Sequence, residues 1–449
     1  MSRVKIIPGG NMDVIKPKKT VGDTGWFVQD RFGLFIHWGL YALPARHEWV
    51  KHQEEIPDEK YDVYFKYFDP DLYDPNLWAK AAYNAGMKYF VITTKHHEGF
   101  CLWDSKLTDY KAPNTPAKKD LLTPMVEAFR NYGFKVGFYH SLIDWHHPDF
   151  IIDSLHSMRN YPDRDKFNQK RDQKKYIEYL HGQVRELLTQ FGKIDIMWFD
   201  FSYPSDPNRP KDWIGKGRKE WDSEKLLKMV RELQPYVILD DRLDLADIEG
   251  AWDIKTPEQY QPREWPKVNG TPVVWEACQT FSGSWGYHRD EYTWKSEEQL
   301  IQMLVDTVSK GGNLLLNVGP TGRGDIDHRA LNRLEAFGKW MKYNNRSIYA
   351  CTQAPEELKA PQDCRFTYNP DTNRLYVHIF AWPFIHLHLD GLAGRVEYAQ
   401  FLNDASEIKM HMDPWFIQQM GKKYENTLTL TLPVRKPDVT VPVIELFLK

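Results

Sequence analysis

The stretch YIEYLHGQVRELLTQFGKIDIMWFDF, residues 176–201, contains the alternation of elements that decides the fold. Its first part carries apolar side chains at helical spacing, which predicts an amphipathic helix (Ile177, Leu180, Val184, Leu187, Leu188 and Phe191). The largely apolar run at residues 194–201 predicts a strand that is buried on both faces. A helix that leads into such a strand is the repeating unit of a parallel α/β sheet.

The same alternation extends along the chain on both sides of this stretch. Further apolar runs predict buried parallel strands at residues 33–37, 89–94, 135–140, 236–240, 272–276 and 313–318. Helices are predicted at residues 121–130, 226–233, 300–308 and 331–341, and Ser296 with Gln299 predicts a capping box before the third. Seven strands and the chain length favour a (β/α)8-like TIM barrel over residues 1–345, irregular because no eighth strand is evident.

The pattern of apolar and polar residues changes after about residue 345. Alternating or β-rich segments follow one another without a long helix, at residues 374–381, 384–389, 396–402, 427–432 and 443–448. Turn residues separate them. We therefore expect a C-terminal antiparallel β-sandwich over residues 346–449.

Composition excludes several classes of function. The net charge of −3, from 59 basic and 62 acidic residues, gives no electrostatic case for nucleic-acid binding. Apolar runs are too short to span a membrane, the first 20 residues lack an apolar leader core, and the four cysteines have no CxxC spacing. We therefore expect a cytoplasmic protein. Aromatic residues make up 14% of the chain, which fits either sugar stacking or a Trp-rich core.

Polar residues gather where the predicted strands end. Six strand ends carry ionisable or polar side chains (His37; His96 and His97; Tyr139 and His140; Asp200; Asp241 and Arg242; Glu276). In a barrel the carboxyl ends of the strands form the active-site face. The pattern therefore predicts a catalytic site rather than six unrelated structural residues.

Asp200 is the clearest candidate among them. It closes a largely apolar strand, where a lone carboxylate is costly to bury without a partner. A helix cap is the alternative, but Pro204, Pro207 and Pro210 follow and no helix is predicted nearby. We therefore interpret Asp200 as a catalytic carboxylate.

A metal site is a second interpretation of the same strand ends. His37, His96, His140 and Asp200 would be its ligands. The adjacent pair His96–His97 places its imidazoles on opposite sides of a strand, and no His-x-His spacing aims two of them together. Hydrogen bonding of neutral histidines to ligand hydroxyls fits better, so we expect no metal.

Several segments resemble those of the retaining α-L-fucosidases of glycoside hydrolase family 29. They are residues 31–39 (RFGLFIHWG), 94–100 (TKHHEGF), 144–148 (DWHHP), 197–200 (MWFD), 284–287 (SWGY) and 309–320 (SKGGNLLLNVGP). The resemblance covers about residues 20–345 in the family's order. It implies a double displacement by a carboxylate nucleophile and a separate acid/base, without a metal or organic cofactor.

The resemblance also implies catalytic roles. Asp200 looks like the nucleophile, and the segment at residues 252–260 (WDIKTPEQY) resembles the one that carries the acid/base, which points to Glu258. Glu276 is the competitor, and we favour Glu258 because a loop reaches the glycosidic oxygen from above. We expect Asp200 to stay ionised and Glu258 to face a less solvated side.

Other positions resemble the family's sugar pocket. His37, His96, His97 and Trp198 match the residues that hold the fucose hydroxyls and ring, and Glu48 with Trp49 matches a loop pair at the C3–C4 hydroxyls. Further contacts are implied for Tyr139, Arg242 and Trp285, the last on the methyl side of the sugar.

The resulting expectation is an exo-acting α-L-fucosidase that acts on fucosylated oligosaccharides or glycoconjugates with retention. Two other classes stay open: a non-catalytic sugar-binding protein that keeps the pocket, and a metal-dependent hydrolase. A homo-oligomer is a further open expectation.

Overall fold

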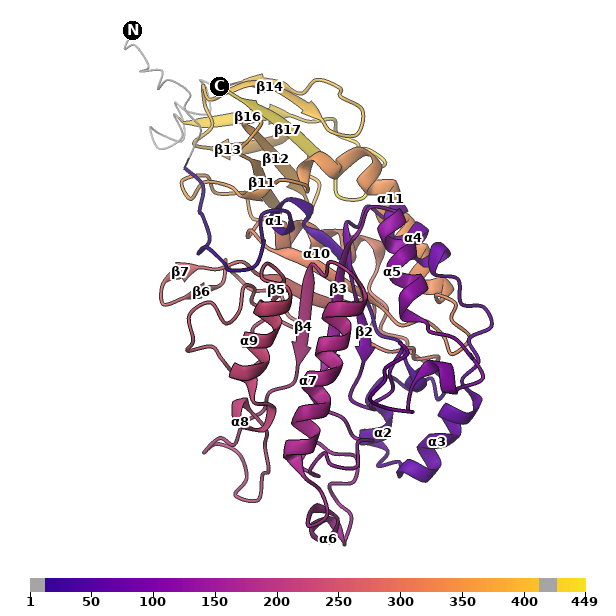
Figure 1. The fold of residues 1–449 in the computed structure, drawn as a ribbon. Helices are drawn as coiled ribbons and strands as arrows, with labels where there is room; N and C mark the ends of the chain where they lie inside the picture. The colour runs from indigo at the N-terminus through magenta and orange to yellow at the C-terminus, as the bar shows by residue number, and fades with distance from the viewer. Residues whose placement is uncertain (1–12, 412–425) are drawn as a thin grey trace.

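The computed structural model describes residues 13–411 and 426–449. Figure 1 shows a parallel sheet surrounded by helices, with smaller antiparallel sheets at one end of the molecule. The leader prediction concerns residues 1–20, of which residues 1–12 lie outside the described part. In the described residues no helix combines the length and the apolar character that a membrane span needs.

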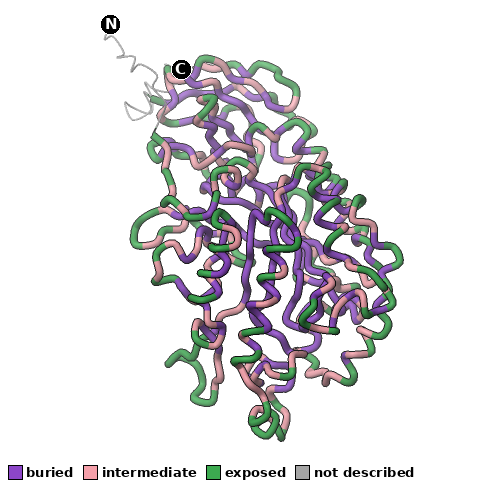
Figure 2. The backbone as a smooth tube through the Cα atoms, viewed as in Figure 1, coloured by how far each residue is buried: buried purple, intermediate pink, exposed green. Residues whose placement is uncertain are grey.

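The larger sheet has seven parallel strands in the order β5-β4-β3-β2-β1-β9-β8. Its strands are β1 Phe32–Ile36, β2 Tyr89–Lys95, β3 Lys135–Ser141, β4 Ile196–Asp200, β5 Ile238–Leu239, β8 Glu276–Thr280 and β9 Asn313–Val318. Apart from Lys135, every residue in them is buried (Figure 2). Helices cover the sheet, which explains why its strands are buried and largely apolar, and six of the seven predicted strands are confirmed.

The helices also follow the predicted pattern. Their bounds are α1 Phe27–Asp30, α2 Val50–Gln53, α3 Asp58–Tyr67, α4 Pro75–Asn84, α5 Leu122–Asn131, α6 Arg164–Asn168, α7 Gln173–Gln190, α8 Arg218–Trp221, α9 Ser223–Leu233, α10 Glu297–Val308 and α11 His328–Asn344. The capping box of α10 is confirmed, because Ser296 Oγ accepts from the Gln299 N–H at 3.1 Å and Gln299 Oε1 accepts from the Ser296 N–H at 2.8 Å.

The predicted strand at residues 272–276 is wrong. A short hairpin occupies this part of the chain, with β6 Lys267–Val268 paired to β7 Thr271–Pro272. Asn269 and Gly270 turn it with φ values of 50° and 78°, the left-handed conformation that an Asn-Gly hairpin turn requires. The buried strand β8 begins only at Glu276, which therefore lies at the amino end of a strand and not at its carboxyl end.

The sheet is irregular between β5 and β8, the two strands at its edges. Residues 254–258 run through this gap and make isolated parallel bridges, Asp240 with Ile254, Lys255 with Trp275 and Glu258 with Cys278. This segment takes the place of an eighth strand. Its Pro257 and its polar residues Lys255, Thr256 and Glu258 explain why the sequence pattern does not predict a buried strand here.

The C-terminal part consists of two antiparallel sheets. The five-stranded sheet has the order β10-β11-β12-β17-β14 and the three-stranded sheet β13-β16-β15. Their strands are β10 Thr352–Gln353, β11 Cys364–Asn369, β12 Arg374–Ile379, β13 His386–Asp390, β14 Val396–Phe401, β15 Lys409–His411, β16 Thr427–Thr431 and β17 Val443–Leu448. Leu375 and Leu446 of one sheet share an apolar core with Leu389 and Leu430 of the other. The predicted antiparallel β region is confirmed, while a boundary between residues 345 and 346 stays a prediction.

Candidate active site

A cavity opens at the carboxyl ends of the parallel strands. Its lining comes from β1, β3, β4 and β8, from loops that follow β1, β2, β4, β5 and β8, and from the segment at residues 254–258 (Phe35, His37, Trp49, His96, His97, Tyr139, Trp198, Asp200, Phe201, Arg242, Glu258, Cys278 and Trp285). Of the catalytic and sugar-binding residues predicted from the sequence, all but Glu48 and Glu276 are in this set, while the strand-end residues His140 and Asp241 are not. Sequence reasoning missed Phe35, Phe201 and Cys278, although the position of Phe201 directly after Asp200 was a signal.

Asp200 ends β4 with a side chain that is only 10% exposed. Its Oδ2 accepts a hydrogen bond from the Tyr139 hydroxyl at 2.7 Å, and its Oδ1 accepts one from Arg242 Nη1 at 2.8 Å. Burial raises the pKa of Asp200 to about 6, against the lowering effect of Arg242. The expectation that Glu258 is the less solvated carboxyl group is wrong, because the Glu258 side chain is 40% exposed.

Arg242 joins the two carboxyl groups. Its Nη1 lies 2.8 Å from Asp200 Oδ1 and also 2.8 Å from Glu258 Oε2. Those two oxygens are therefore at most about 5.6 Å apart, twice the common distance. The guanidinium lies 4.4 Å from the Trp198 ring centroid, and Thr256 accepts from it through Oγ1 at 3.1 Å and its carbonyl at 3.2 Å. Packing and hydrogen bonds thus fix the position of the shared cation.

The irregular segment between β5 and β8 carries Glu258 to the cavity. The bridge to Cys278 sets Glu258 beside the middle of β8, and the next residue, Gln259, has a left-handed φ of 58°. Gln259 stays beside β8, because its N–H donates to the carbonyl oxygen of Cys278 at 3.1 Å. The Glu258 carboxyl group lines the cavity and contacts Arg242 there.

Glu276, the competing acid, lies elsewhere. It is completely buried, and its Oε2 accepts a hydrogen bond from the Tyr89 hydroxyl at 2.5 Å. Burial raises its pKa to about 8. Because Glu276 begins β8 and is absent from the cavity lining, the structure does not bring it together with Asp200.

The cavity histidines are neutral at neutral pH. Burial lowers the pKa of His37 to about 4 and the pKa of His96 and of His97 well below its ordinary value. His140 is absent from the lining and contacts Thr94 Oγ1 at 3.0 Å through Nδ1. In residues 13–411 and 426–449 no three His, Cys, Asp or Glu side chains form a group that could hold a metal ion.

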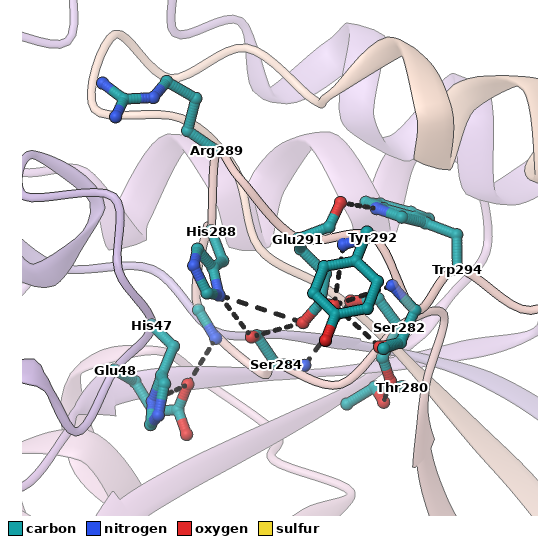
Figure 3. Close-up of polar contacts among 12 residues, drawn as sticks. His47, Glu48, Thr280, Ser282, Ser284, His288, Arg289, Glu291, Tyr292 and Trp294 are labelled. Carbon is teal, nitrogen blue, oxygen red and sulfur yellow. Dashed lines mark hydrogen bonds and ion pairs between the residues drawn. The ribbon is translucent and has the colours of Figure 1, made fainter.

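Glu48 lies beside the cavity and holds the loop that carries Trp285. Its Oε2 accepts from the Gly286 N–H at 2.8 Å and lies 3.4 Å from His47 Nδ1 (Figure 3). Burial alone would raise the pKa of Glu48, but His47 and the Gly286 N–H hold it below its usual range. An ionised Glu48 therefore fixes this loop from one side.

A second network fixes the same loop from the other side. Ser284 donates to Glu291 Oε2 at 3.0 Å and contacts His288 Nδ1 at 3.1 Å (Figure 3). Glu291 also accepts from the backbone N–H groups of Tyr292 and Thr293 at 2.9 and 2.8 Å. The loop that places Trp285 against His37, with ring centroids 5.1 Å apart, is thus held at both ends.

The aromatic residues occur both in the cavity, where they could stack on a sugar, and in the core. Trp49, Trp198 and Trp285 line the cavity, and Trp49 packs 5.0 Å from the His97 ring. Trp103 and Trp221 are completely buried in the core of the barrel.

Comparisons with known proteins agree with this site. A family model described as alpha-L-fucosidase matches residues 16–346. Human plasma alpha-L-fucosidase is 30% identical over 386 residues, which cover 80% of this chain and 76% of that protein. The structure of alpha-L-fucosidase isoenzyme 1 from Paenibacillus thiaminolyticus matches with a TM-score of 0.87 and 45% identity, over 95% of this chain and 98% of that one. A trapped covalent intermediate of the family 29 enzyme from Bacteroides thetaiotaomicron, in complex with 2-fluoro-fucosyl fluoride, matches with a TM-score of 0.80 and 28% identity, over 99% and 100%.

Proposed function

Because the chain belongs to the α-L-fucosidase family, glycoside hydrolase family 29, and has the activity of an α-L-fucosidase, we propose how its own residues carry out that reaction. Asp200 is the nucleophile, Glu258 is the acid/base, and the reaction is a double displacement that retains the anomeric configuration. The substrates are terminal α-L-fucosyl groups of oligosaccharides or glycoconjugates.

The shared contact of Arg242 carries this proposal. Retaining glycosidases need their two carboxyl groups about 5–5.5 Å apart, whereas inverting enzymes leave room for a water molecule between them. Asp200 Oδ1 and Glu258 Oε2, which are at most about 5.6 Å apart, fit the first arrangement.

The first step forms a covalent fucosyl-enzyme. Ionised Asp200 attacks the anomeric carbon while Glu258 protonates the departing glycosidic oxygen. The Tyr139 hydroxyl and Arg242 Nη1 bind one Asp200 oxygen each, so they orient the carboxylate and stabilise its charge before attack.

The second step reverses the role of the acid. Glu258, now ionised, takes a proton from water, and the water oxygen replaces Asp200 at the anomeric carbon. The exposed position of Glu258 supports this role, because both the leaving group and the incoming water approach from solvent. Phe35 and Trp198 line the cavity and are buried, and these aromatic walls support exo-action on a terminal sugar.

The anomer of the first product tests the mechanism. We expect hydrolysis of 4-nitrophenyl α-L-fucoside, followed by proton NMR, to release α-L-fucose before mutarotation. Initial release of the β-anomer would contradict retention, and absence of turnover would favour the non-catalytic sugar-binding alternative.

The metal-dependent alternative needs a separate test. We expect the purified protein to keep its activity in EDTA and to contain no stoichiometric metal. A stoichiometric zinc ion that is lost when His37 or His96 is replaced would overturn the metal-free proposal. Homo-oligomerisation and a cytoplasmic location stay predictions, which light scattering and cell fractionation test.

A further inference from the structure

Two histidines in the cavity wall are each held from behind by one polar side chain. Asn317 contacts His37, and Ser141 contacts His97. We propose that Asn317 and Ser141 fix both imidazoles with the proton on Nδ1, so that each Nε2 accepts a hydrogen bond from a sugar hydroxyl. The identity of the sugar rests on the proposed function, whereas the position of the two protons does not.

Asn317 determines the orientation of His37. It is 2% exposed on β9, and its Nδ2 donates to the carbonyl oxygen of Trp285 at 2.6 Å. Because a carbonyl oxygen only accepts, the amide cannot be flipped without placing two acceptors together. The amide oxygen therefore faces His37 Nδ1 at 2.7 Å, and this nitrogen must carry the proton.

Ser141 determines the orientation of His97 by a different route. Its hydroxyl has one proton, and the carbonyl oxygen of Ile143, 2.9 Å away, can only accept, so donation of that proton to Ile143 satisfies the carbonyl. The Ser141 oxygen also accepts from the Ile143 N–H at 3.0 Å. His97 Nδ1, 2.6 Å from the same oxygen, is therefore a donor.

The opposite nitrogen of each ring is left as an acceptor. Both rings are buried and neutral, so each carries a single proton. In the part of the chain that the structure describes, neither Nε2 has a hydrogen-bond partner; His97 Nε2 lies 3.9 Å from Asp200 Oδ2, which is too long for one. Both rings line the cavity, so the two unprotonated nitrogens are available to a ligand.

This arrangement makes part of the cavity wall an acceptor surface. Asp200 adds carboxylate oxygens to the two imidazole nitrogens, and acceptors of this kind bind groups that donate a proton. Sugar hydroxyls at these positions are therefore recognised as donors, which selects against a sugar that lacks them. Asn317 and Ser141 act through the histidines and are positioning residues.

Nitrogen-15 NMR of the full-length, ligand-free protein, labelled in its histidine rings, tests the proton positions directly. We expect His37 and His97, assigned through His37→Gln and His97→Gln, to show a protonated Nδ1 and an unprotonated Nε2. A protonated Nε2 in either ring would overturn the proposal for that ring, whatever the protein hydrolyses.

Variants separate the positioning role from general damage. Ser141→Ala should populate the other tautomer of His97 and should raise KM, so that kcat/KM falls about tenfold or more. Ser141→Thr keeps the hydroxyl and should restore both the tautomer and kcat/KM. Asn317→Ala should do the same for His37, and Glu48 still holds the Trp285 loop through Gly286 (Figure 3). Unchanged tautomers in both alanine variants would contradict the role of the two side chains.

Thr94→Val is the matched control. Thr94 Oγ1 also contacts a buried histidine, His140, but that ring does not line the cavity. The variant removes a buried hydroxyl–imidazole contact of the same kind. We expect it to leave KM and the tautomers of His37 and His97 unchanged.

The sugar side of the proposal is tested with L-fucose and its monodeoxy and monofluoro analogues. Fluorine does not donate a hydrogen bond. At the two ring positions whose hydroxyls face the histidines, the deoxy analogue and the fluoro analogue should therefore each bind about tenfold more weakly than L-fucose, and as weakly as each other. Binding restored by fluorine at those positions would show that the nitrogens donate, and would contradict the proposal. The expected tautomers in a protein that binds no L-fucose would instead contradict the proposed function.

Discussion

Arg242 allows the carboxyl groups of Asp200 and Glu258 to lie close together in the cavity. Its Nη1 is equidistant, at 2.8 Å, from an oxygen of Asp200 and an oxygen of Glu258. The cation offsets part of the repulsion between them, yet burial still raises the pKa of Asp200 to about 6. The protonation of Asp200 thus depends on its burial and on this guanidinium.

A pH–rate profile tests this dependence. We expect kcat/KM to fall as the pH drops through about 6, because protonated Asp200 cannot attack. Arg242→Gln removes the charge that lowers the pKa of Asp200, so the acidic limb should move to higher pH and kcat/KM at neutral pH should fall at least about tenfold. An acidic limb at the wild-type pH in folded Arg242→Gln would contradict this dependence. Arg323→Gln, which removes an exposed ion pair, is the control and should leave the profile unchanged.

The leaving group separates Glu258 from Glu276. Glu258→Ala should nearly abolish hydrolysis of natural oligosaccharides but spare the first step with a nitrophenyl fucoside, whose phenolate leaves without a proton. Fucosyl-enzyme should then accumulate, and azide should speed turnover and give α-fucosyl azide.

Glu276→Gln provides the matched comparison, since it keeps the size and the contact with Tyr89. We expect it to hydrolyse both kinds of substrate at similar relative rates, without azide rescue. If Glu276→Gln showed the leaving-group dependence and the α-fucosyl azide product while Glu258→Ala did not, the acid would be Glu276 and the assignment to Glu258 would be wrong.

The sequence identifies most polar residues of the site but not its apolar ones. His37, His97 and Asp200 stand at strand ends, where an ionisable side chain after an apolar run is conspicuous. Phe35 and Cys278 lie inside buried strands and look like ordinary core residues. Which of them faces the cavity depends on strand position and tilt, which composition does not specify.

At the scale of elements, the start of β8 is the main difference between expectation and structure. The apolar run at residues 272–276 satisfies the pattern of a strand, but the Asn-Gly turn before it commits Thr271 and Pro272 to a hairpin. The segment that takes the place of an eighth strand could not be predicted either. Residues 254–258 are positioned by isolated bridges to the chain after β5 and to the region of β8. Such a segment depends on tertiary contacts rather than on local propensity.

The shifted start of β8 leaves a carboxyl group in the core, with a consequence for stability. The pKa of Glu276 rises from its ordinary value of 4.5 to about 8, so below 4.5 the folded and unfolded states both hold the proton. Between these values the unfolded state loses the proton first, so stability should decrease by about 1.4 kcal/mol per pH unit as the pH rises.

Glu276→Gln has no such proton to lose. Its free energy of unfolding is measured with urea at several pH values. The difference from the wild type should shift in favour of the variant as the pH rises towards 8. Parallel pH dependence of the two proteins would contradict a protonated Glu276 in the core.

At the scale of the whole molecule, the antiparallel sheets lie far from the chemistry. Arg31, directly before β1, donates to the carbonyl of Cys351 at 2.8 Å and to that of Gly311, before β9, at 2.7 Å. The C-terminal part is therefore attached at the amino ends of the parallel strands, whereas the cavity opens at their carboxyl ends (Figure 1). The sequence predicts both parts of the chain but not this attachment, which depends on long-range contacts.

Arg31→Ala should separate stability from activity. It leaves buried carbonyl groups without their donor, so we expect a loss of about 3 kcal/mol in the free energy of unfolding, with KM unchanged. Arg323→Ala, at an exposed ion pair with Asp71, should cost less than about 1 kcal/mol. A large rise in KM for Arg31→Ala would indicate that the attachment reaches the active site.

Trapping of the covalent intermediate tests the central assignment most directly. The protein is incubated with 2-deoxy-2-fluoro-fucosyl fluoride, digested, and mapped by tandem mass spectrometry, with Asp200→Asn as the control. We predict one fluorofucosyl group per chain, attached to Asp200, and none on the control, because Asp200 attacks the anomeric carbon. A label on any other residue, or labelling of Asp200→Asn at the wild-type rate, would contradict the account.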